Sequence, residues 1–160
     1  MNSRQPRTRS PQLILAAAKQ WDGRVGVGTI FRGRDGFSTH KLGFVSESTD
    51  IEEALYRALL DALDYATEHS IRGLVVYVDD DHVARALDLQ AEVPDALRPW
   101  FAQVRCRANA LWPTRFEVAP IGVAIPARRL AQDALQYGQT LNLTHDTALL
   151  PLSFSQDLVA

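Results

Sequence analysis

The segment from residue 51 to residue 87 constrains the fold most, because it joins a long amphipathic helix to a short apolar strand. Apolar side chains recur there at spacings of three and four, which places them on one helix face: Ile51, Ala54, Leu55, Ala58, Leu59, Ala62, Leu63 and Ala66. Gly73 ends this pattern, and the run 74–78 is rich in β-branched and aromatic residues. A strand that is apolar on both faces is typical of the centre of a sheet covered by helices. The segment therefore predicts a helix packed on an α/β sheet.

Three acids, Asp79, Asp80 and Asp81, directly follow this strand. Helical spacing then resumes at Val83 and Leu87. Ligands of open α/β sheets bind at the carboxyl ends of the strands, so the acids form a candidate site. Capping explains them equally well, because amide hydrogens and the dipole at a helix start favour carboxylates. The sequence leaves both interpretations open.

The residues before this segment predict an antiparallel meander. Three strands, at 13–19, 24–32 and 37–45, are separated by turns that each contain an Asp-Gly pair, a hairpin signal. Gly26 and Gly28 interrupt the second strand, which indicates a bulge or the close approach of another element. They do not form a phosphate loop, since no helix follows them.

The residues after the acids predict two more helices and one more strand. A helix starts near Pro94, a short strand covers 116–118, and a closing helix begins after Pro126. A right-handed crossover would place the fourth strand beside the first and parallel to it. We therefore expect an α/β fold with a mixed five-stranded sheet, three strands antiparallel and the later ones parallel to the first, flanked by helices.

The 160 residues fit one domain with three parts. Residues 1–11 contain three arginines among polar residues and predict a flexible basic arm. Residues 12–140 form the domain, and residues 141–160 are an apolar but aperiodic tail, expected to dock on the body or on a protein partner.

Composition limits the classes of partner. The formal charge is −2, so nucleic-acid binding would have to come from local patches and not from an overall basic excess. The single cysteine, Cys106, cannot form an internal disulfide, and no apolar run of membrane-spanning length is present. We expect a cytoplasmic protein that does not enter a membrane.

The runs Glu53–Ala66 and Leu74–Leu87 resemble the central helix and fourth strand of the ribonuclease H type 1 family. The likeness extends more weakly from about Leu13 to about Tyr137, and the order of the elements agrees. It implies a ribonuclease H-like fold. Members of that family cut the RNA strand of an RNA–DNA hybrid with two metal ions, held by acids on the first strand, central helix, fourth strand and last helix.

This chain departs from the family pattern at three of those four positions. The first-strand acid falls at Ala17 or Ala18, the central-helix acid at Leu55 and the closing-helix acid at Arg128, while Asp79 is kept. Methyl and isobutyl groups cannot bind Mg²⁺, and a guanidinium repels it. The resemblance therefore implies an inactive relative with a degenerate metal site and no cofactor, in which Asp79 is the one remaining metal-ligand candidate.

Three hypotheses about function follow. In the first, the protein binds nucleic acid, an RNA–DNA hybrid or DNA, or a protein partner, without cleavage. Nucleic-acid binding would be weak and salt-dependent. The arginines expected to contribute are Arg98, Arg105, Arg107, Arg128 and Arg129. Three of these arginines lie on the helix that starts near Pro94. The competing explanation is that this face of the helix is simply solvated and the nearby tryptophans pack into the core.

The second hypothesis is a metal-dependent ribonuclease that cleaves RNA–DNA hybrids. Its relocated Mg²⁺ ligands would be Asp79 with Glu52 and Asp80 or Asp81. The third is a structural or assembly module that docks through residues 141–160. Convergence of three carboxylates around Asp79 would favour the second hypothesis.

Overall fold

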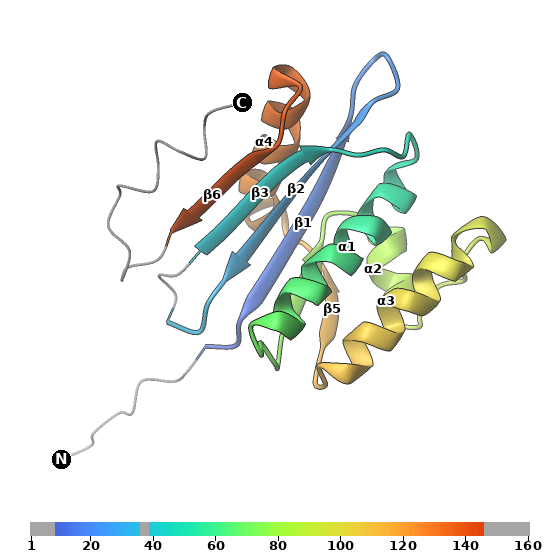
Figure 1. Ribbon diagram of the computed structural model, residues 1–160. Helices are drawn as coiled ribbons and strands as arrows, with labels where there is room; N and C mark the ends of the chain where they lie inside the picture. The colour runs from blue at the N-terminus through green and yellow to red at the C-terminus, as the bar shows by residue number, and fades with distance from the viewer. Residues whose placement is uncertain (1–8, 36–38, 146–160) are drawn as a thin grey trace.

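The computed structural model describes residues 9–35 and 39–145 (Figure 1). Strands β1 (Gln12–Lys19), β2 (Val25–Arg32) and β3 (Thr39–Val45) form the predicted antiparallel meander. The expected start of the third strand at Phe37 lies outside the described residues, as does most of the expected basic arm. The three strand-like runs and the Asp-Gly turns between them were therefore sufficient to predict this half of the sheet.

Helix α1 (Ile51–Glu68) and strand β4 (Val75–Val78) follow the meander. The helix starts where Asp50 accepts a hydrogen bond from the backbone N–H of Glu52 at 3.1 Å. Strand β4 pairs with β1 in parallel, with Leu15 opposite Val78. This pairing confirms the expected crossover from the meander through α1 to a central parallel strand.

The sheet has six strands in the order β5-β4-β1-β2-β3-β6, which corrects the expected five. Strand β5 (Arg115–Val118) is the predicted last parallel strand. Strand β6 (Leu141–His145) pairs antiparallel with β3, so the start of the expected tail belongs to the sheet. Leucine alternates with a polar residue over only a few positions there, too few to identify a strand inside a segment that is aperiodic as a whole. Residues 146–160 lie outside the described residues.

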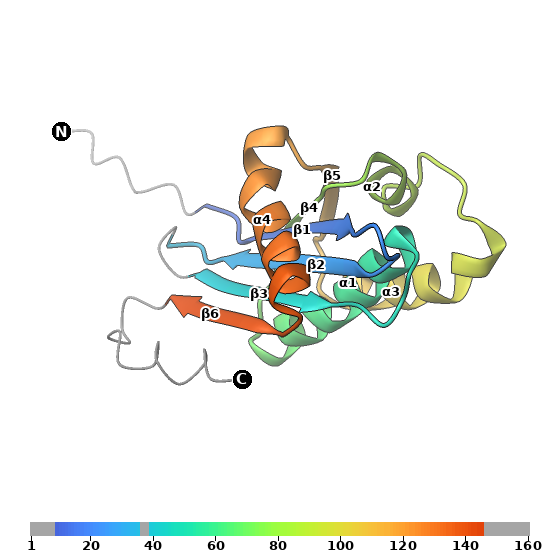
Figure 2. The same ribbon diagram turned by 90° about the horizontal axis from the view of Figure 1, so that it is seen from above.

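Helices cover the two faces of the sheet unequally (Figure 2). Helices α1, α2 (Asp81–Leu87) and α3 (Arg98–Ala110), the last preceded by the 3₁₀ turn η1 (Asp95–Leu97), lie on one side. Alternation along β1 sends Leu13 and Leu15 into the large core beneath α1, and Ile14 and Ala16 into a smaller core on the opposite side. None of the helices in the described part of the chain is long and apolar enough to cross a membrane.

Helix α4 (Ile121–Tyr137) covers the opposite side. The expectation that it begins after Pro126 is wrong, because its cap is Pro120 and Pro126 lies inside the helix. The helical spacing of apolar residues is strong only after Pro126, so the sequence indicated a start at Pro126 and not at Pro120. Proline inside a helix removes a backbone donor and crowds the carbonyl four residues earlier. That carbonyl belongs to Gly122, which is exposed and has open space around it.

Glycines in β2 let α4 lie directly on the sheet. A Cβ atom at Gly28 would stand 2.1 Å from the carbonyl oxygen of Ala127, and one at Gly26 would stand 2.2 Å from that of Ala131. Close approach, one of the two explanations offered by the sequence, is therefore the reason for these glycines. We call Gly26 and Gly28 the glycine notch. It fixes the position of α4 and of the side chains that α4 extends toward β4.

Candidate functional site

The candidate site lies at the carboxyl end of β4, where β1, α2 and α4 come together. The backbone N–H of Asp79 donates to the carbonyl oxygen of Leu15 at 2.8 Å, which continues the β1–β4 pairing by one residue. Asp79 is therefore held beside the middle of β1 by the sheet itself. Its carboxylate is largely covered, with a side-chain exposure of 14%.

Arg128 from α4 binds Asp79 through two parallel hydrogen bonds. Its Nη2 donates to Oδ1 at 2.8 Å and its Nε donates to Oδ2 at 2.5 Å. This is the fork-to-fork geometry of strong guanidinium–carboxylate pairs. Hydrogen bonding and charge attraction from Asp79 raise the pKa of the Arg128 guanidinium. Both oxygens of the one retained acid are thus engaged by a cation from the protein.

Leu55 lies where the sequence resemblance expects the central-helix acid, and Ala17 or Ala18 lies where it expects the first-strand acid. Leu55 is 0% exposed and belongs to the large core. Ala17 is partly buried against the same core, whereas alternation along β1 turns Ala18 toward the opposite face. Of the two aligned positions, Ala17 is therefore the one that shares a face with Leu55. Neither residue offers an oxygen to a metal ion.

Glu52, a candidate relocated ligand, is bound to His82 instead. Its Oε1 forms a close hydrogen bond with His82 Nδ1, and His82 Nε2 lies 3.0 Å from the carbonyl oxygen of Glu92. Both ring nitrogens thus face acceptors, which the doubly protonated ring satisfies best. The hydrogen bond to Glu52 raises the pKa of His82. The interaction links α1 to α2 across 30 residues of sequence, and no local pattern predicts it.

The other two acids also have roles in α2. Asp80 caps this helix by accepting a hydrogen bond from the backbone N–H of Val83 at 2.9 Å. Asp81 is exposed and lies 3.5 Å from Arg85, one turn later in the same helix. Capping, the alternative explanation for these acids, therefore describes the geometry of Asp80.

The site is a partly exposed network of hydrogen bonds and ion pairs around the buried Tyr56, without the features of a metal centre. Burial raises the pKa of Tyr56 to about 12, and the charges of Glu52 and Asp80 add to the rise. Within the described ranges, no group of three or more His, Cys, Asp or Glu side chains is arranged to hold a metal ion. The residues at the four family positions do not fit a pair of divalent ions, because two are apolar and the other two neutralise each other.

Three of the arginines expected to contact nucleic acid come from α3 and have partners within the protein. Arg98 lies 3.1 Å from Asp95, and Arg107 lies 2.7 Å from Asp64 of α1. Arg105 donates to the carbonyl oxygen of Leu87 at 3.0 Å. The contacts of Arg105 and Arg107 join α3 to α2 and α1, whereas the contact of Arg98 is local. Arg129 is exposed beside Arg128 in α4.

The tryptophans near these arginines are placed differently from one another. The indole N–H of Trp100 donates to Glu53 Oε1 at 3.1 Å, and its ring packs partly against the core. Trp112 is 74% exposed, and Trp21, in the β1–β2 turn, is 92% exposed. The competing explanation for α3, with tryptophans packed in the core, therefore fits Trp100 and fails for Trp112.

Sequence comparison assigns the chain to a family. Residues 15–134 of the 160 match the reverse transcriptase-like family. The chain belongs to this ribonuclease H-like family. No curated protein sequence matches it. The matched residues run from β1 into α4, so they include every position of the candidate site.

Solved ribonuclease H domains have the same fold as this family member. The N-terminal RNase H domain of Rv2228c from Mycobacterium tuberculosis is 21% identical, with a TM-score of 0.69, covering 80% of this chain and 96% of that one. RNase H1 of the archaeon Halobacterium salinarum is also 21% identical, with a TM-score of 0.72 and coverages of 81% and 99%. LC11-RNase H1 from compost, solved with an RNA/DNA hybrid, is 18% identical, with a TM-score of 0.65 and coverages of 81% and 99%. These similarities confirm the ribonuclease H-like fold expected from the sequence.

Proposed function

We propose that this ribonuclease H-like protein binds nucleic acid without cleaving it and uses no divalent ion. The observation that carries the proposal is the paired Asp79 and Arg128. Metal-assisted hydrolysis needs several free carboxylates to hold two mutually repelling ions and to position water. Here the one carboxylate kept at the family positions is bound at both oxygens by a guanidinium.

The exchange of an acid for Arg128 also changes what the site attracts. A cluster of acids repels the phosphate backbone unless metal ions are bound, whereas an arginine attracts it. The Arg128 side chain is 44% exposed although it is paired, and the adjacent Arg129 is exposed too. Arg129 and the exposed part of the Arg128 guanidinium give phosphate a modest attraction, which salt would weaken. The fold is shared with LC11-RNase H1, which was solved with an RNA/DNA hybrid, and this likeness supports the choice of ligand class.

A nuclease assay tests the absence of cleavage. A labelled RNA–DNA hybrid is incubated with the purified protein in Mg²⁺ or Mn²⁺, beside the Asp79→Asn variant. We expect no cleavage above the level of the variant in either metal ion. Cleavage by the parent that disappears in Asp79→Asn would overturn the proposal and support a nuclease with relocated ligands.

A binding titration tests the affinity for nucleic acid. Anisotropy of a labelled hybrid is followed at several salt concentrations with the parent and with Arg128→Ala and Arg129→Ala. We expect weak binding that falls as salt rises and that each substitution weakens further. Arg72→Ala is the matched control, since this exposed arginine precedes β4 at the opposite end of the strand from Asp79. Absence of binding at low salt, or equal effects of all three substitutions, contradicts the proposal.

A further inference from the structure

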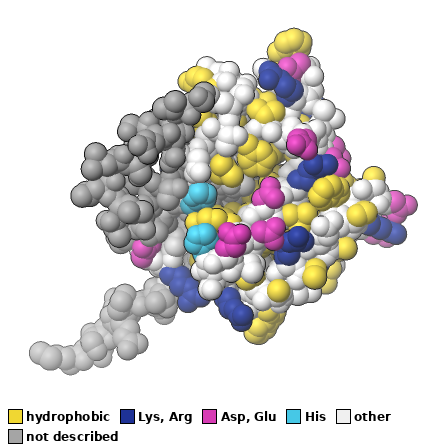
Figure 3. Space-filling view, in the orientation of Figure 1, with side chains coloured by type: hydrophobic (Ala, Val, Ile, Leu, Met, Phe, Trp, Pro, Cys, Tyr) yellow, Lys and Arg dark blue, Asp and Glu magenta, His cyan; other side chains and the backbone are white. Residues whose placement is uncertain are grey.

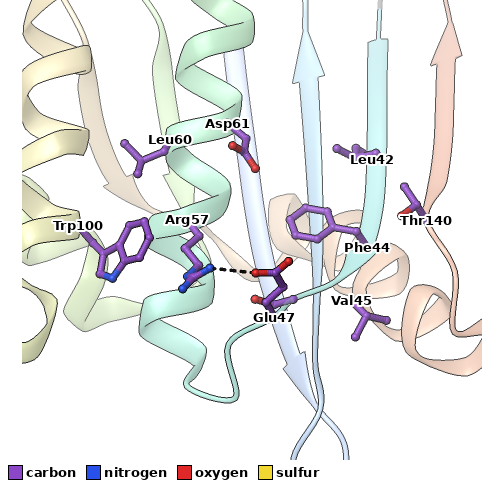
Figure 4. Close-up of a pocket in the computed structure, with 10 residues that line it drawn as sticks. Leu42, Phe44, Val45, Glu47, Arg57, Leu60, Asp61, Trp100 and Thr140 are labelled. Carbon is purple, nitrogen blue, oxygen red and sulfur yellow. Dashed lines mark ion pairs between the residues drawn. The ribbon is translucent and has the colours of Figure 1, made fainter.

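The two ends of the sheet differ in how their polar groups are used. Beside β3, a hollow of about 550 Å³ brings apolar and charged side chains together on the face shown in Figure 3. Its arginine, Arg57, is already engaged, because its Nη1 lies 3.5 Å from Glu47 and its guanidinium lies 4.5 Å from the centre of the Trp100 ring (Figure 4). At the other end of the sheet, strand β5 has backbone groups and charged side chains without partners among the described residues.

Strand β5 is an edge of the sheet in the part of the chain that the structure describes, since it pairs there with β4 alone (Figure 1). The backbone N–H of Arg115 donates to the carbonyl oxygen of Leu74, just before β4, at 3.0 Å. Successive residues of a strand direct their backbone groups to opposite sides, so Phe116 and Val118 direct theirs to the open edge. An open edge is a template for pairing with another strand.

The side chains of β5 include two exposed charges of opposite sign. Phe116 is buried in the large core, so Arg115 and Glu117 point to the opposite side of the sheet, the side of α4. Neither has an ion-pair partner within the described ranges. Charges of a single sign on this edge would repel a second copy, which is one way proteins protect open edges. Arg115 and Glu117 differ in sign, so an antiparallel strand with the same two residues complements them.

We propose that two copies of this chain pair through the open edge of β5, antiparallel, with Phe116 of one copy opposite Phe116 of the other. This two-fold arrangement places Arg115 of each copy opposite Glu117 of the other, with their Cβ atoms about 4.5–5.5 Å apart. Sliding one strand by two residues in either direction places Glu117 opposite Glu117 or Arg115 opposite Arg115. Like charges directly opposite each other are unfavourable, so the charges select one register.

Exposed apolar side chains at both ends of β5 fit the same register. Trp112, three residues before the strand, is 74% exposed, and Ile121, the first residue of α4, is 71% exposed. An antiparallel pair brings the start of one strand beside the end of the other, so Trp112 of one copy comes level with Ile121 of the second copy. Burial of these side chains favours association. The paired strands are short, so the dimer is weak and dissociates on dilution.

Analytical ultracentrifugation over a range of protein concentrations tests the pairing. The parent should show a monomer–dimer equilibrium. Glu117→Arg and Arg115→Glu each place like charges opposite each other and should each weaken the dimer by roughly tenfold or more. Asp133→Arg is the matched control, because it makes the same change of charge as Glu117→Arg on the exposed side of α4, which lies mainly over β1, β2 and β3. It should leave the equilibrium unchanged. A parent that stays monomeric at every concentration, or a dimer that both reversals leave intact, overturns the proposal.

Mixing the two reversed variants separates loss of pairing from loss of folding. Arg115→Glu has two acids on its edge and Glu117→Arg has two arginines, so each repels its own copies and complements the other variant. An equimolar mixture should therefore form a heterodimer with an affinity near that of the parent dimer. The double variant Arg115→Glu/Glu117→Arg should form a homodimer again, since it exchanges the two charges. Circular dichroism shows whether each variant is folded, and a mixture of folded variants that remains monomeric overturns the proposal.

Discussion

Leu55 and Arg128 both lie where the sequence resemblance expects an acid, but their surroundings are opposite. Leu55 is fully buried and has become part of the packing between α1 and the sheet. Arg128 remains half exposed at the surface and acts through charge on Asp79. Leu55 contributes to the stability of the whole fold, while Arg128 mainly sets the electrostatics around Asp79. The two positions of the candidate site therefore differ in how much they contribute to folding.

The largest effect is expected at Leu55. Leu55→Ala should lower the free energy of unfolding by roughly 2–5 kcal/mol, through lost burial and a residual cavity. Denaturant unfolding measures the change, with Leu89→Ala as the control at a leucine that is 70% exposed. Equal stability of Leu55→Ala and its parent would show that α1 does not bury this side chain, and the contrast with Arg128 would disappear.

The glycine notch should give the next largest effect. Gly28→Ala places a methyl group against the Ala127 carbonyl oxygen, which belongs to the backbone and cannot turn aside. We expect a loss of about 1–3 kcal/mol and a displaced α4. Gly122→Ala is the matched control, since its Cβ meets no atom within 4 Å, and it should gain about 0.4–1 kcal/mol. If both variants are equally stable, α4 is not seated by the notch.

Removal of the guanidinium should change stability less than either of these substitutions. Arg128→Ala breaks an ion pair whose cation is solvated, so solvent screening limits the loss. Thermal melts at low and high salt measure it, and the difference from the parent should shrink as salt rises. A loss as large as that of Leu55→Ala, unaffected by salt, would make the pair a structural element equal to the core.

The smallest expected effect is the pH dependence contributed by His82. The hydrogen bond to Glu52 raises the pKa of His82 above the ordinary 6.5, although desolvation acts in the opposite direction. The charges of Glu52 and Asp80 and the hydrogen bond to the Glu92 carbonyl raise this pKa further. A raised folded-state pKa stabilises the fold fully below 6.5, and this contribution is lost as pH rises through the folded value.

His82→Gln keeps a polar side chain but cannot be protonated. The parent should exceed it in stability most at acidic pH, and the gap should narrow toward alkaline pH. Parent and variant are compared at each pH, which cancels the opposite contribution of His40, whose pKa is lowered by burial. If the difference in stability between parent and variant is the same at every pH, protonation of His82 does not contribute to stability.

Local patterns predicted the elements of the fold well. The spacing of Leu55 and Leu59 predicted α1, and the missing side chains at Gly26 and Gly28 indicated the close approach that α4 makes. Strand β6 was missed because it is short and lies in an aperiodic segment. The start of α4 was placed too late because a proline inside a helix looks like a proline at its beginning.

The sequence could not predict which charged side chains of the site bind each other. Asp79 and Arg128 are 49 residues apart, and the sequence resemblance placed both near one site without showing that they bind each other. The sequence indicated Glu52 only as a candidate metal ligand, and no local pattern indicated its hydrogen bond with His82. Side-chain partners across elements depend on crossing angles and on helix seating, such as that set by the glycine notch, which no local spacing encodes.

The bond between Asp79 and Arg128 also has an evolutionary meaning. Reversal of Arg128 to an acid alone would leave Asp79 facing a like charge with too few partners to recruit an ion. An acid at Leu55 alone would place an unpaired charge in the core. Each single substitution toward a two-ion site is thus unfavourable by itself, and only the full set of acids, with metal ions bound, removes the repulsion. Under the proposed function, the pair of Asp79 and Arg128 therefore makes a stepwise gain of a metal site unfavourable.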